Sequence, residues 1–466
     1  MIEYYKDNNT ILYNSDCLVV LKDIIDNSVD CIVTDPPYGI GMVGKSWDKK
    51  LPSIDIWREC LRVLKPGAFS FIMCIPRQDC LSRMIINLED AGFNISFTSI
   101  YHCFSSGFPK ATNISRFLDK RLGINRPIIN EIKSGGFAHI SKTNVEQDYR
   151  PDDYYRIQGN KIKSNEPQSE QARRLLGSYT GFQPKPAVEI IIVVMKPLSE
   201  KSYVDQALNN WHGVTWFDNC KIPYMNDKDK ESARFGSQSD IRNNNYLTPT
   251  AIYAKNVLSS ETGRFPANLL VSDDILNDNI DRKGVSGGGP KEYGGGGGFE
   301  NNLNRQPVKN YYNDIGSFSR YFNLDFWFEN KIKELPENIQ KTFPFMIESK
   351  PSKSEKNRGL DNLEDKIGGG IKGTENGSLK TGSGNERNNM MKNNHPTVKP
   401  IKLMSYLITL GSRENETILD PFMGSGSTII AAKMSNRQSI GIEKEKDYIE
   451  IAKSRIQSVI CQNKLF

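Results

Sequence analysis

The sequence has few of the residues from which metal sites and disulfide frameworks are built. Only four histidines and eight cysteines occur among 466 residues, and no two cysteines form a C-x-x-C pair. This scarcity argues against a zinc site and against a disulfide-stabilised secreted scaffold. We therefore predict no metal and a cytoplasmic protein.

Long hydrophobic runs are also absent. No apolar segment follows Met1, and the longest strongly apolar run, VEIIIVVM at 188–195, has eight residues. A membrane-spanning helix needs about 20. The sequence thus predicts no membrane partner.

Positive charge is in modest excess and unevenly distributed. The net charge is +6, and residues 105–186 alone hold fourteen Lys and Arg against eight Asp and Glu, interleaved with Tyr and Phe. A basic, aromatic-rich stretch is typical of a surface that binds a polyanion such as nucleic acid. A solvated basic face explains the same composition, and both interpretations stay open.

Strand and helix patterns alternate at both ends of the chain, which predicts an α/β fold with a mostly parallel sheet. The expected strands are 11–14, 29–34, 68–75, 94–103, 416–420 and 438–443. The expected helices are a stretch from Asp16, 54–67, 77–93, 400–412, 427–435 and 446–460. The two C-terminal strands cannot form a stable open sheet alone. They are expected to join the N-terminal strands, with the middle of the chain inserted between them.

The insertion contains two Gly- and Asn-rich tracts, 284–298 and 368–394. Both lack the apolar residues that offset the entropy cost of ordering, so we expect loops there.

The segment LDPFMGSGSTIIAAK at 419–433 has the pattern of a cofactor loop. A strand ends at Asp420, glycines 424 and 426 allow a tight turn, and Ser427 or Thr428 is expected to cap the next helix. Glu443 ends the following strand, where an acid accepts hydrogen bonds from ribose hydroxyls.

The loop does not match the dinucleotide pattern G-x-G-x-x-G, because Ile429 occupies the third glycine position. A nucleoside that carries a carboxylate instead of a pyrophosphate fits at least as well. S-adenosylmethionine is such a ligand.

The strand at 29–34 ends abruptly in Asp35-Pro36-Pro37-Tyr38. An exocyclic amino group of a nucleobase is a poor nucleophile, and acceptors aimed at its hydrogens favour attack on a methylsulfonium. Asp35 offers a carboxylate, Pro36 a carbonyl without a competing N–H, and Tyr38 a face for an extruded base. A proline-rich turn with a buried tyrosine is the structural alternative.

These two motifs, in this order, resemble the amino-group DNA methyltransferases of the β arrangement, of bacterial or phage type. In that arrangement the catalytic motif precedes the cofactor motif. The resemblance is strongest over 11–122 and 395–455. Further matching stretches are NSDCLVVLKDI, KSWDKKLPSIDIWRECLRVLKPG, SGFPKATNISRFLDK and HPTVKP.

The resemblance implies a Rossmann-like methyltransferase sheet and assigns roles to single residues. The implied catalytic residues are Asp35, Pro36, Pro37 and Tyr38. The implied cofactor-binding residues are Asp16, His395, Thr397, Lys399, Asp420, Phe422, Gly424, Gly426 and Glu443. Taken singly, Asp16 is equally a helix N-cap and Lys399 a surface charge.

The predicted activity is methylation of N6 of adenine in double-stranded DNA, because D-P-P-Y is more often associated with adenine in this family. Cytosine N4 is the alternative, followed by RNA or protein amide methylation and by a catalytically silent DNA-binding module. A cytosine-C5 enzyme is disfavoured because the sequence contains no Pro-Cys.

The predicted domains are a catalytic half at 1–122, a target-recognition insertion at 123–394 and a cofactor half at 395–466. Arg173 and Arg174 are the expected DNA contacts within the insertion. The resemblance suits a restriction-modification setting, but the sequence leaves open whether an endonuclease accompanies the protein and what its oligomeric state is.

Overall fold

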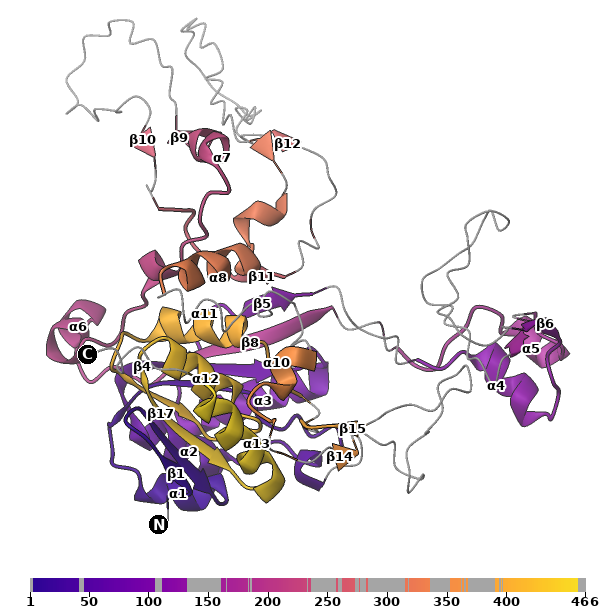
Figure 1. The fold of residues 1–466 in the computed structure, drawn as a ribbon, viewed down its shortest axis with the longest axis horizontal. Coiled ribbons are helices and arrows are strands. Elements are labelled where there is room, and N and C mark those ends of the chain that lie inside the picture. The colour runs from indigo at the N-terminus through magenta and orange to yellow at the C-terminus, as the bar shows by residue number, and fades with distance from the viewer. Residues whose placement is uncertain are drawn as a thin grey trace, which may run out of the picture.

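The computed structural model contains one nine-stranded sheet covered by helices (Figure 1). It describes residues 3–41, 46–104, 111–131, 161–164, 166–182, 184, 187–232, 234–235, 257–258, 262–272, 276, 282–283, 315–316, 318–335, 353–361, 363, 366–367, 390–393, 395 and 397–459. The tract 284–298, most of 368–394 and much of the basic stretch lie outside these ranges.

The sheet joins segments from both ends of the chain. In spatial order its strands are β1 (Tyr5–Lys6), β2 (Thr10–Asn14), β17 (Gln438–Glu443), β16 (Thr417–Asp420), β3 (Val29–Thr34), β4 (Leu64–Cys74), β8 (Val188–Met195), β5 (Ile100–Cys103) and β11 (Leu269–Val271). The five strands from β2 to β4 are parallel, and β8 is antiparallel to both its neighbours. The predicted Rossmann-like α/β sheet is confirmed.

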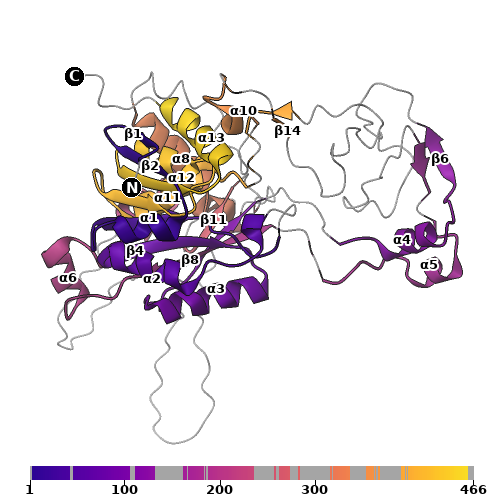
Figure 2. The same ribbon diagram turned by 90° about the horizontal axis from the view of Figure 1, so that it is seen from below.

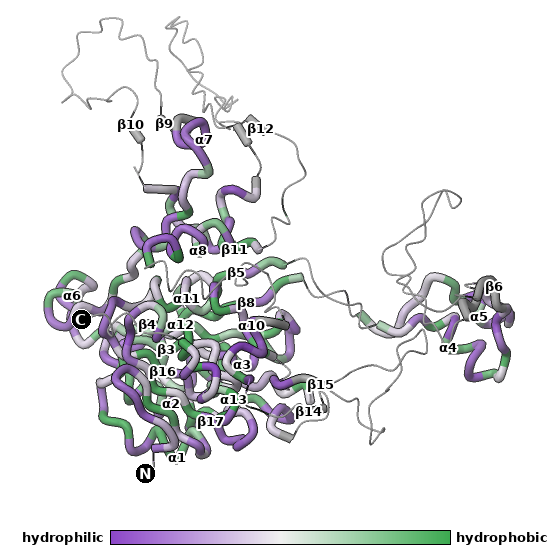
Figure 3. Tube along the Cα trace, viewed as in Figure 1, coloured by the Kyte–Doolittle hydropathy of each residue, from purple (hydrophilic) through white to green (hydrophobic). Residues whose placement is uncertain are grey.

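Helices cover the sheet on both faces (Figure 2). One face carries α1 (Cys17–Asp23), α2 (Ile54–Val63) and α3 (Gln78–Ala91). The other carries α8 (Leu324–Lys333), α11 (Ile401–Gly411), α12 (Ser427–Met434) and α13 (Lys446–Gln457). Every residue of β3 is buried, as expected for a strand covered on both faces. Figure 3 shows the hydrophobic residues concentrated in these strands and in the helices that cover them.

Two strands of the sheet come from the segment that the sequence assigned to the insertion. β8 is the apolar run at 188–195, and it pairs with β4 and β5, while β11 pairs with β5 at the edge. The sequence pattern showed the apolar run but not its partners. The sheet therefore needs part of 123–394 as well as the two ends of the chain.

Two elements differ clearly from the predictions. The helix expected at 54–67 ends at Val63, and β4 begins at Leu64; Pro66 disfavours a helical conformation at Lys65 and so opposes a longer helix. The strand expected at 94–103 is regular only over Ile100–Cys103, with an isolated bridge from Asn94 to Met195.

A small unit stands apart from the sheet in both views (Figures 1 and 2). It consists of α4 (Ile114–Arg121), α5 (Glu170–Arg174), β6 (Ile128–Glu131) and β7 (Lys161–Lys163). Buried Asp119 links its parts by accepting hydrogen bonds from Arg126 Nε at 2.7 Å and from the backbone N–H of Gln168 and Ser169 at 3.0 Å. A carboxylate with several donors is well compensated for its burial.

Further short helices and strands lie outside the nine-stranded sheet. They include α6 (Tyr203–Asn210), α7 (Asp227–Ser232), α10 (Lys353–Asn357) and the pair β14 (Lys366–Ile367) and β15 (Met390–Met391). Among the residues described, no helix is both long and apolar enough to cross a bilayer.

The position of β8 within the core gives a stability prediction. Ile191 is fully buried and pairs with Met73 and Ile100 across the two neighbouring strands. Ile191→Ala should lower the free energy of unfolding by about 2–5 kcal/mol, since it removes buried methyl groups and leaves a cavity. Urea unfolding measures the loss. Ile86→Ala, at a half-exposed position of α3, is the control and should stay within about 0.5 kcal/mol. Equal effects would contradict the placement of β8 in the core.

Candidate functional site

The two sequence motifs lie next to each other at the carboxyl edge of the sheet. β3 and β16 are adjacent parallel strands, so Asp35, just after β3, and Asp420, at the end of β16, come to the same edge. Thr34 Oγ1 donates a hydrogen bond of 2.7 Å to Asp420 Oδ1, across 386 residues of sequence. Strand order reverses around β16 and β3, and ligands bind at such a switch point in open α/β sheets.

A cavity of about 330 Å³ opens at this edge. This volume lies in the range of roughly 300–1,000 Å³ that is usual for small-molecule sites. The predicted residues that line it are Asp16, Asp35, Pro37, His395, Thr397, Lys399, Asp420, Phe422, Gly424 and Glu443. Pro36, Tyr38 and Gly426 are not part of its lining. The structure thus gathers most of the predicted catalytic and cofactor residues around one cavity.

The glycine loop at 421–426 is held closely by its neighbours. Gly424 has φ +55°, and a Cβ there would lie 2.7 Å from His395 Nε2. Its backbone N–H donates to Glu443 Oε2 at 2.9 Å, while Glu443 Oε1 accepts from the N–H of Glu445 at 2.7 Å. Glu443 therefore orders the loop and presents its carboxylate to the cavity at the same time.

Gly426, predicted to allow a tight turn and to bind the cofactor, lies where the loop meets α12. Its φ is +83°, and a Cβ would lie 3.1 Å from Ala452 Cβ, so this glycine allows α12 to approach α13. It is also the N-cap of α12, without a side-chain hydrogen bond. The predicted cap by Ser427 or Thr428 is wrong, because the helix starts at Ser427 and Thr428 already lies in its first turn.

Burial controls the charge of the two acids in the cofactor loop region. Burial raises the pKa of Asp420 to about 6, although hydrogen bonds from Thr428, Thr34 and the N–H of Phe422 act to lower it. It raises the pKa of Glu443 to about 7, against the two backbone N–H groups that bind this carboxylate. Desolvation favours the neutral form of both groups.

The catalytic motif belongs to a buried cluster of four side chains. Tyr38 Oη donates a hydrogen bond to Asp35 Oδ1, and Lys399 Nζ lies 3.2 Å from the same oxygen. Lys399 also donates to Tyr38 Oη at 3.3 Å and pairs with Glu189 of β8, whose Oε1 is 3.4 Å from Tyr38 Oη. The cluster thus combines two carboxylates, one ammonium and one phenol.

Electrostatics in this cluster are set first by burial. Burial raises the pKa of Asp35 to about 6, although the Lys399 ammonium acts in the opposite direction. Burial also pushes the pKa of Glu189 upward, but Lys399 outweighs it and leaves that pKa below its usual value. The two carboxylates hold the pKa of Lys399 above its ordinary value, against burial. Lys399 is thus charged, and because only 13% of its side chain is exposed it is not a surface charge.

His395, Thr397 and Lys399 belong to the lining of the cavity. The His395 ring lies parallel to Trp47 at 6.4 Å between centroids and edge-on to Tyr448 at 4.5 Å. The Thr397 N–H donates to His395 Nδ1 at 3.3 Å. This aromatic wall places apolar ring faces beside the polar groups of the loop.

Asp16, for which the sequence left two roles open, lies at the start of α1 beside the cavity. It is the N-cap of α1, where Oδ1 accepts from the N–H of Leu18 at 3.0 Å, and it also lines the cavity. Its other oxygen is 3.2 Å from Lys444 Nζ.

Arg173 and Arg174 do not approach the cavity, because they lie in α5 of the separate unit. Arg173 donates to the carbonyl of Gln168 at 2.8 Å, and exposed Arg174 pairs with Glu170 at 2.7 Å. Surface pairs of this kind contribute little stability.

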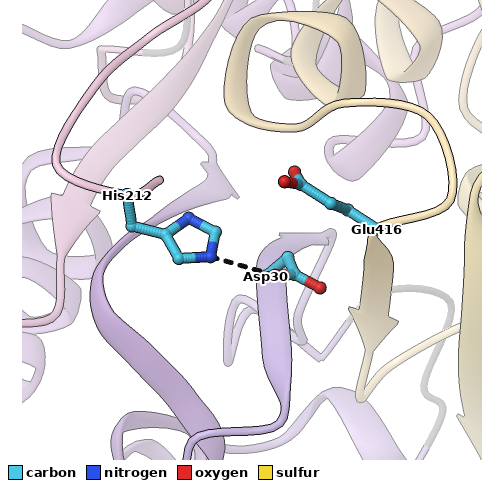
Figure 4. Close-up of side chains that lie close together, drawn as sticks. All are labelled: Asp30, His212 and Glu416. Carbon is cyan, nitrogen blue, oxygen red and sulfur yellow. Dashed lines mark hydrogen bonds and ion pairs between the residues drawn. The ribbon is translucent and has the colours of Figure 1, made fainter. Parts of the chain in front are cut away.

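Asp30, His212 and Glu416 form a second polar cluster at the start of β3 and β16, the opposite end of the strands from the cavity (Figure 4). Asp30 is already bound by His212 Nε2 at 2.9 Å, by Lys65 and by the N–H of Thr417 at 2.8 Å. Arg413 binds Glu416 through its side chain at 2.8 Å. Because both carboxylates have cationic partners, the cluster is a structural network that links the two strands.

Sequence reasoning missed Glu189 and Trp47. The sequence signal for Glu189 was a single acid near the start of an apolar strand, where an unpaired carboxylate is costly. Only the antiparallel direction of β8 brings that start to the carboxyl edge of β3.

Comparisons with known proteins agree on one family. The DNA methylase family of the N6/N4 type matches residues 29–454. The type II methyltransferase M2.LlaDCHI of Lactococcus lactis subsp. cremoris is 43% identical over 76 residues, which is 16% of this chain and 28% of that protein. M.HpaI of Haemophilus parainfluenzae is 47% identical over 64 residues, 14% of this chain and 20% of that protein. The chain thus spans less than a third of the length of these curated relatives.

Two solved structures align along most of the chain. The cytosine-N4-specific PvuII DNA methyltransferase covers 97% of this chain and 88% of its own, with a TM-score of 0.39 and 11% identity. M1.HpyAVI in complex with SAM covers 96% of this chain and 99% of its own, with a TM-score of 0.33 and 14% identity.

The bond between Thr34 and Asp420 gives a prediction for the site. Thr34→Val keeps the shape of the side chain but leaves buried Asp420 without one donor. The free energy of unfolding should fall by about 1–3 kcal/mol, the usual cost of an unsatisfied buried group. Thr34→Ser retains the hydroxyl and should recover most of this loss. The urea midpoints of the two variants measure this difference. Equal midpoints would contradict a stabilising role for the Thr34–Asp420 hydrogen bond.

Proposed function

The chain belongs to the N6/N4 DNA methylase family, and we propose that it transfers the methyl group of S-adenosylmethionine to N6 of adenine in double-stranded DNA. The single observation that carries the proposal is that Asp35 and Pro37 of the D-P-P-Y motif line one cavity together with Gly424. A nucleoside site and an acceptor for an amino group are then within reach of each other.

The residues of the cavity fit S-adenosylmethionine. The carboxylate of Glu443 faces the cavity, where it suits two ribose hydroxyls, and Phe422 and His395 offer apolar surfaces. Ser427 Oγ is buried, lines the cavity and has no hydrogen-bond partner among the described residues. A polar ligand would satisfy this group.

Asp35 is the proposed acceptor for the amino group. When bound, S-adenosylmethionine supplies a methylsulfonium, so that the amino nitrogen forms the new N–C bond while the C–S bond breaks and its electron pair stays on sulfur. The Asp35 carboxylate and the Pro36 carbonyl accept from the two N–H groups and favour the tetrahedral nitrogen. Asp35, with a pKa of about 6, then takes the proton that the nitrogen loses. Tyr38 provides the face on which the extruded base stacks.

DNA is proposed to contact the unit that contains α5. Arg173, Arg174 and the aromatic side chains of Tyr179 and Phe182 lie within a short stretch of chain, and Phe182 is 93% exposed. Arginine and exposed aromatic rings together are typical of nucleic-acid contacts. We also propose that residues 123–394 recognise the target sequence, while the outer segments 1–122 and 395–466 carry out methyl transfer.

Label transfer tests the function. With tritiated S-adenosylmethionine and duplex DNA, the wild-type protein should yield N6-methyladenine on nucleoside analysis. Asp35→Ala should slow transfer by about 10²–10³-fold or more, because it removes a preorganised acceptor. Calorimetry should still detect cofactor binding. Exposed Asp55→Ala is the matched control.

The identity of the labelled product decides between the alternatives. N4-methylcytosine would replace the adenine assignment, and label in RNA or protein would move the substrate to another class. Wild-type turnover by Asp35→Ala would remove Asp35 from the chemistry.

The raised pKa of Glu443 predicts that cofactor affinity depends on pH. Below about pH 7 this carboxyl is protonated in the free protein, and a neutral carboxyl is a weaker acceptor for ribose hydroxyls. Binding should therefore release a proton, and the association constant should rise with pH up to about 7 and then level off. Calorimetry in two buffers of different ionisation enthalpy counts this proton. Glu443→Gln should bind more weakly and lose the rise in affinity up to about pH 7. An unchanged dependence in this variant would exclude Glu443 as its source.

A further inference from the structure

Glu189 is the residue at the site that the proposed chemistry leaves without a role. It lies on β8 beside β5, where its register partner is His102. Only 16% of its side chain is exposed, and a buried carboxylate persists only when it is paired. Its partner is Lys399, which also faces Asp35.

One ammonium therefore serves two carboxylates. Lys399 Nζ hydrogen-bonds Glu189 Oε1 and lies 3.2 Å from Asp35 Oδ1, and Tyr38 Oη stands between the two acids. If Lys399 paired with Asp35 alone, it would occupy the acceptor positions that an amino group needs. It would also stabilise the ionised form of Asp35 and make that carboxylate a weaker base.

We propose that Glu189 is a positioning residue that draws Lys399 away from Asp35, so that Asp35 is free to accept the N–H of the target amino group. The inference rests on the proposed function. Lys399 can exchange between the carboxylates without leaving the cluster, because its contacts to both already exist in this structure. When the base arrives, Glu189 retains the ammonium and the positive charge stays compensated.

The charged and titratable groups around Asp35 agree with this role. Lys399 lowers the pKa of Asp35 and Glu189 raises it, so that together with burial it reaches about 6. Tyr38 donates to Asp35, and Cys74 lies near it at the end of β4. His102 of β5 faces Glu189. Without the negative charge of Glu189, Lys399 would pair with Asp35 alone. The pKa of Asp35 should then fall.

Single-turnover methyl transfer as a function of pH tests the proposal. Glu189→Gln keeps the shape of the side chain and removes its charge. The plateau rate should fall at least about tenfold, a part of the 10²–10⁴ that a positioned proton acceptor contributes. The acid limb of the profile should move to lower pH. Glu334→Gln, at the exposed C-cap residue of α8, is the matched control and should change neither quantity.

A double variant separates positioning from mere structural support. In Glu189→Gln with Lys399→Met no ammonium holds Asp35, so transfer should be faster than in Glu189→Gln alone. A double variant that is no faster, or a Glu189→Gln protein with the wild-type rate and profile, would overturn the proposal.

A readout without turnover keeps this inference distinct from the proposed function. In protein labelled with ¹³C at aspartate carboxyls, Asp35→Asn assigns the signal of Asp35. Its apparent pKa should fall in Glu189→Gln and rise in Lys399→Met. A wild-type protein that transfers no methyl group would contradict the proposed function, while the titration would still decide the role of Glu189. An Asp35 signal unaffected by Glu189→Gln would overturn it.

Discussion

The pairing of β16 with β3 is the interaction on which the rest of the structure depends. It joins segments from the two ends of the chain, and through it the glycine loop and the Asp35 motif come to the same edge of one sheet. The Thr34–Asp420 hydrogen bond stabilises this strand pair at the end beside the cavity. The hydrogen bond from the N–H of Thr417 to Asp30 stabilises it at the opposite end. Neither motif forms the site alone, because each supplies only some of the residues that line the cavity.

Desolvation is the second shared feature of the site. Asp35, Asp420 and Glu443 are buried carboxyls, and burial raises the pKa of each into the range between about 6 and 7. Such groups respond strongly to a ligand or a neighbouring charge, since few water molecules screen them. Lys399 is the compensating cation for one end of the cavity, and its two carboxylate partners make its position adjustable.

The segment 123–394 contributes to two different bodies. Part of it completes the sheet through β8 and β11, and through α8, which packs on the core formed with α11. Another part, together with α4, forms the separate unit around Asp119 that includes α5. The part that forms β8 and β11 is thus stabilised by the core of the main sheet, whereas the separate unit is stabilised by its own hydrogen bonds.

The sequence by itself determined the local secondary structure around the two motifs. Short-range patterns of apolar residues, glycines and prolines predicted β3, β16, β17 and the helices that follow them, because these depend on neighbours along the chain. The D-P-P-Y and glycine-loop motifs likewise predicted Asp35, Gly424 and Glu443 as site residues, and all three line the cavity.

Tertiary structure alone decided which distant residues meet. The run at 188–195 looked like an apolar stretch of the insertion, yet its antiparallel pairing with β4 places Glu189 beside Lys399 and Asp35. Gly426 likewise lies close to Ala452 of α13, a contact that its motif does not show. Contacts of this kind depend on strand direction and register between segments hundreds of residues apart, and no local pattern encodes those.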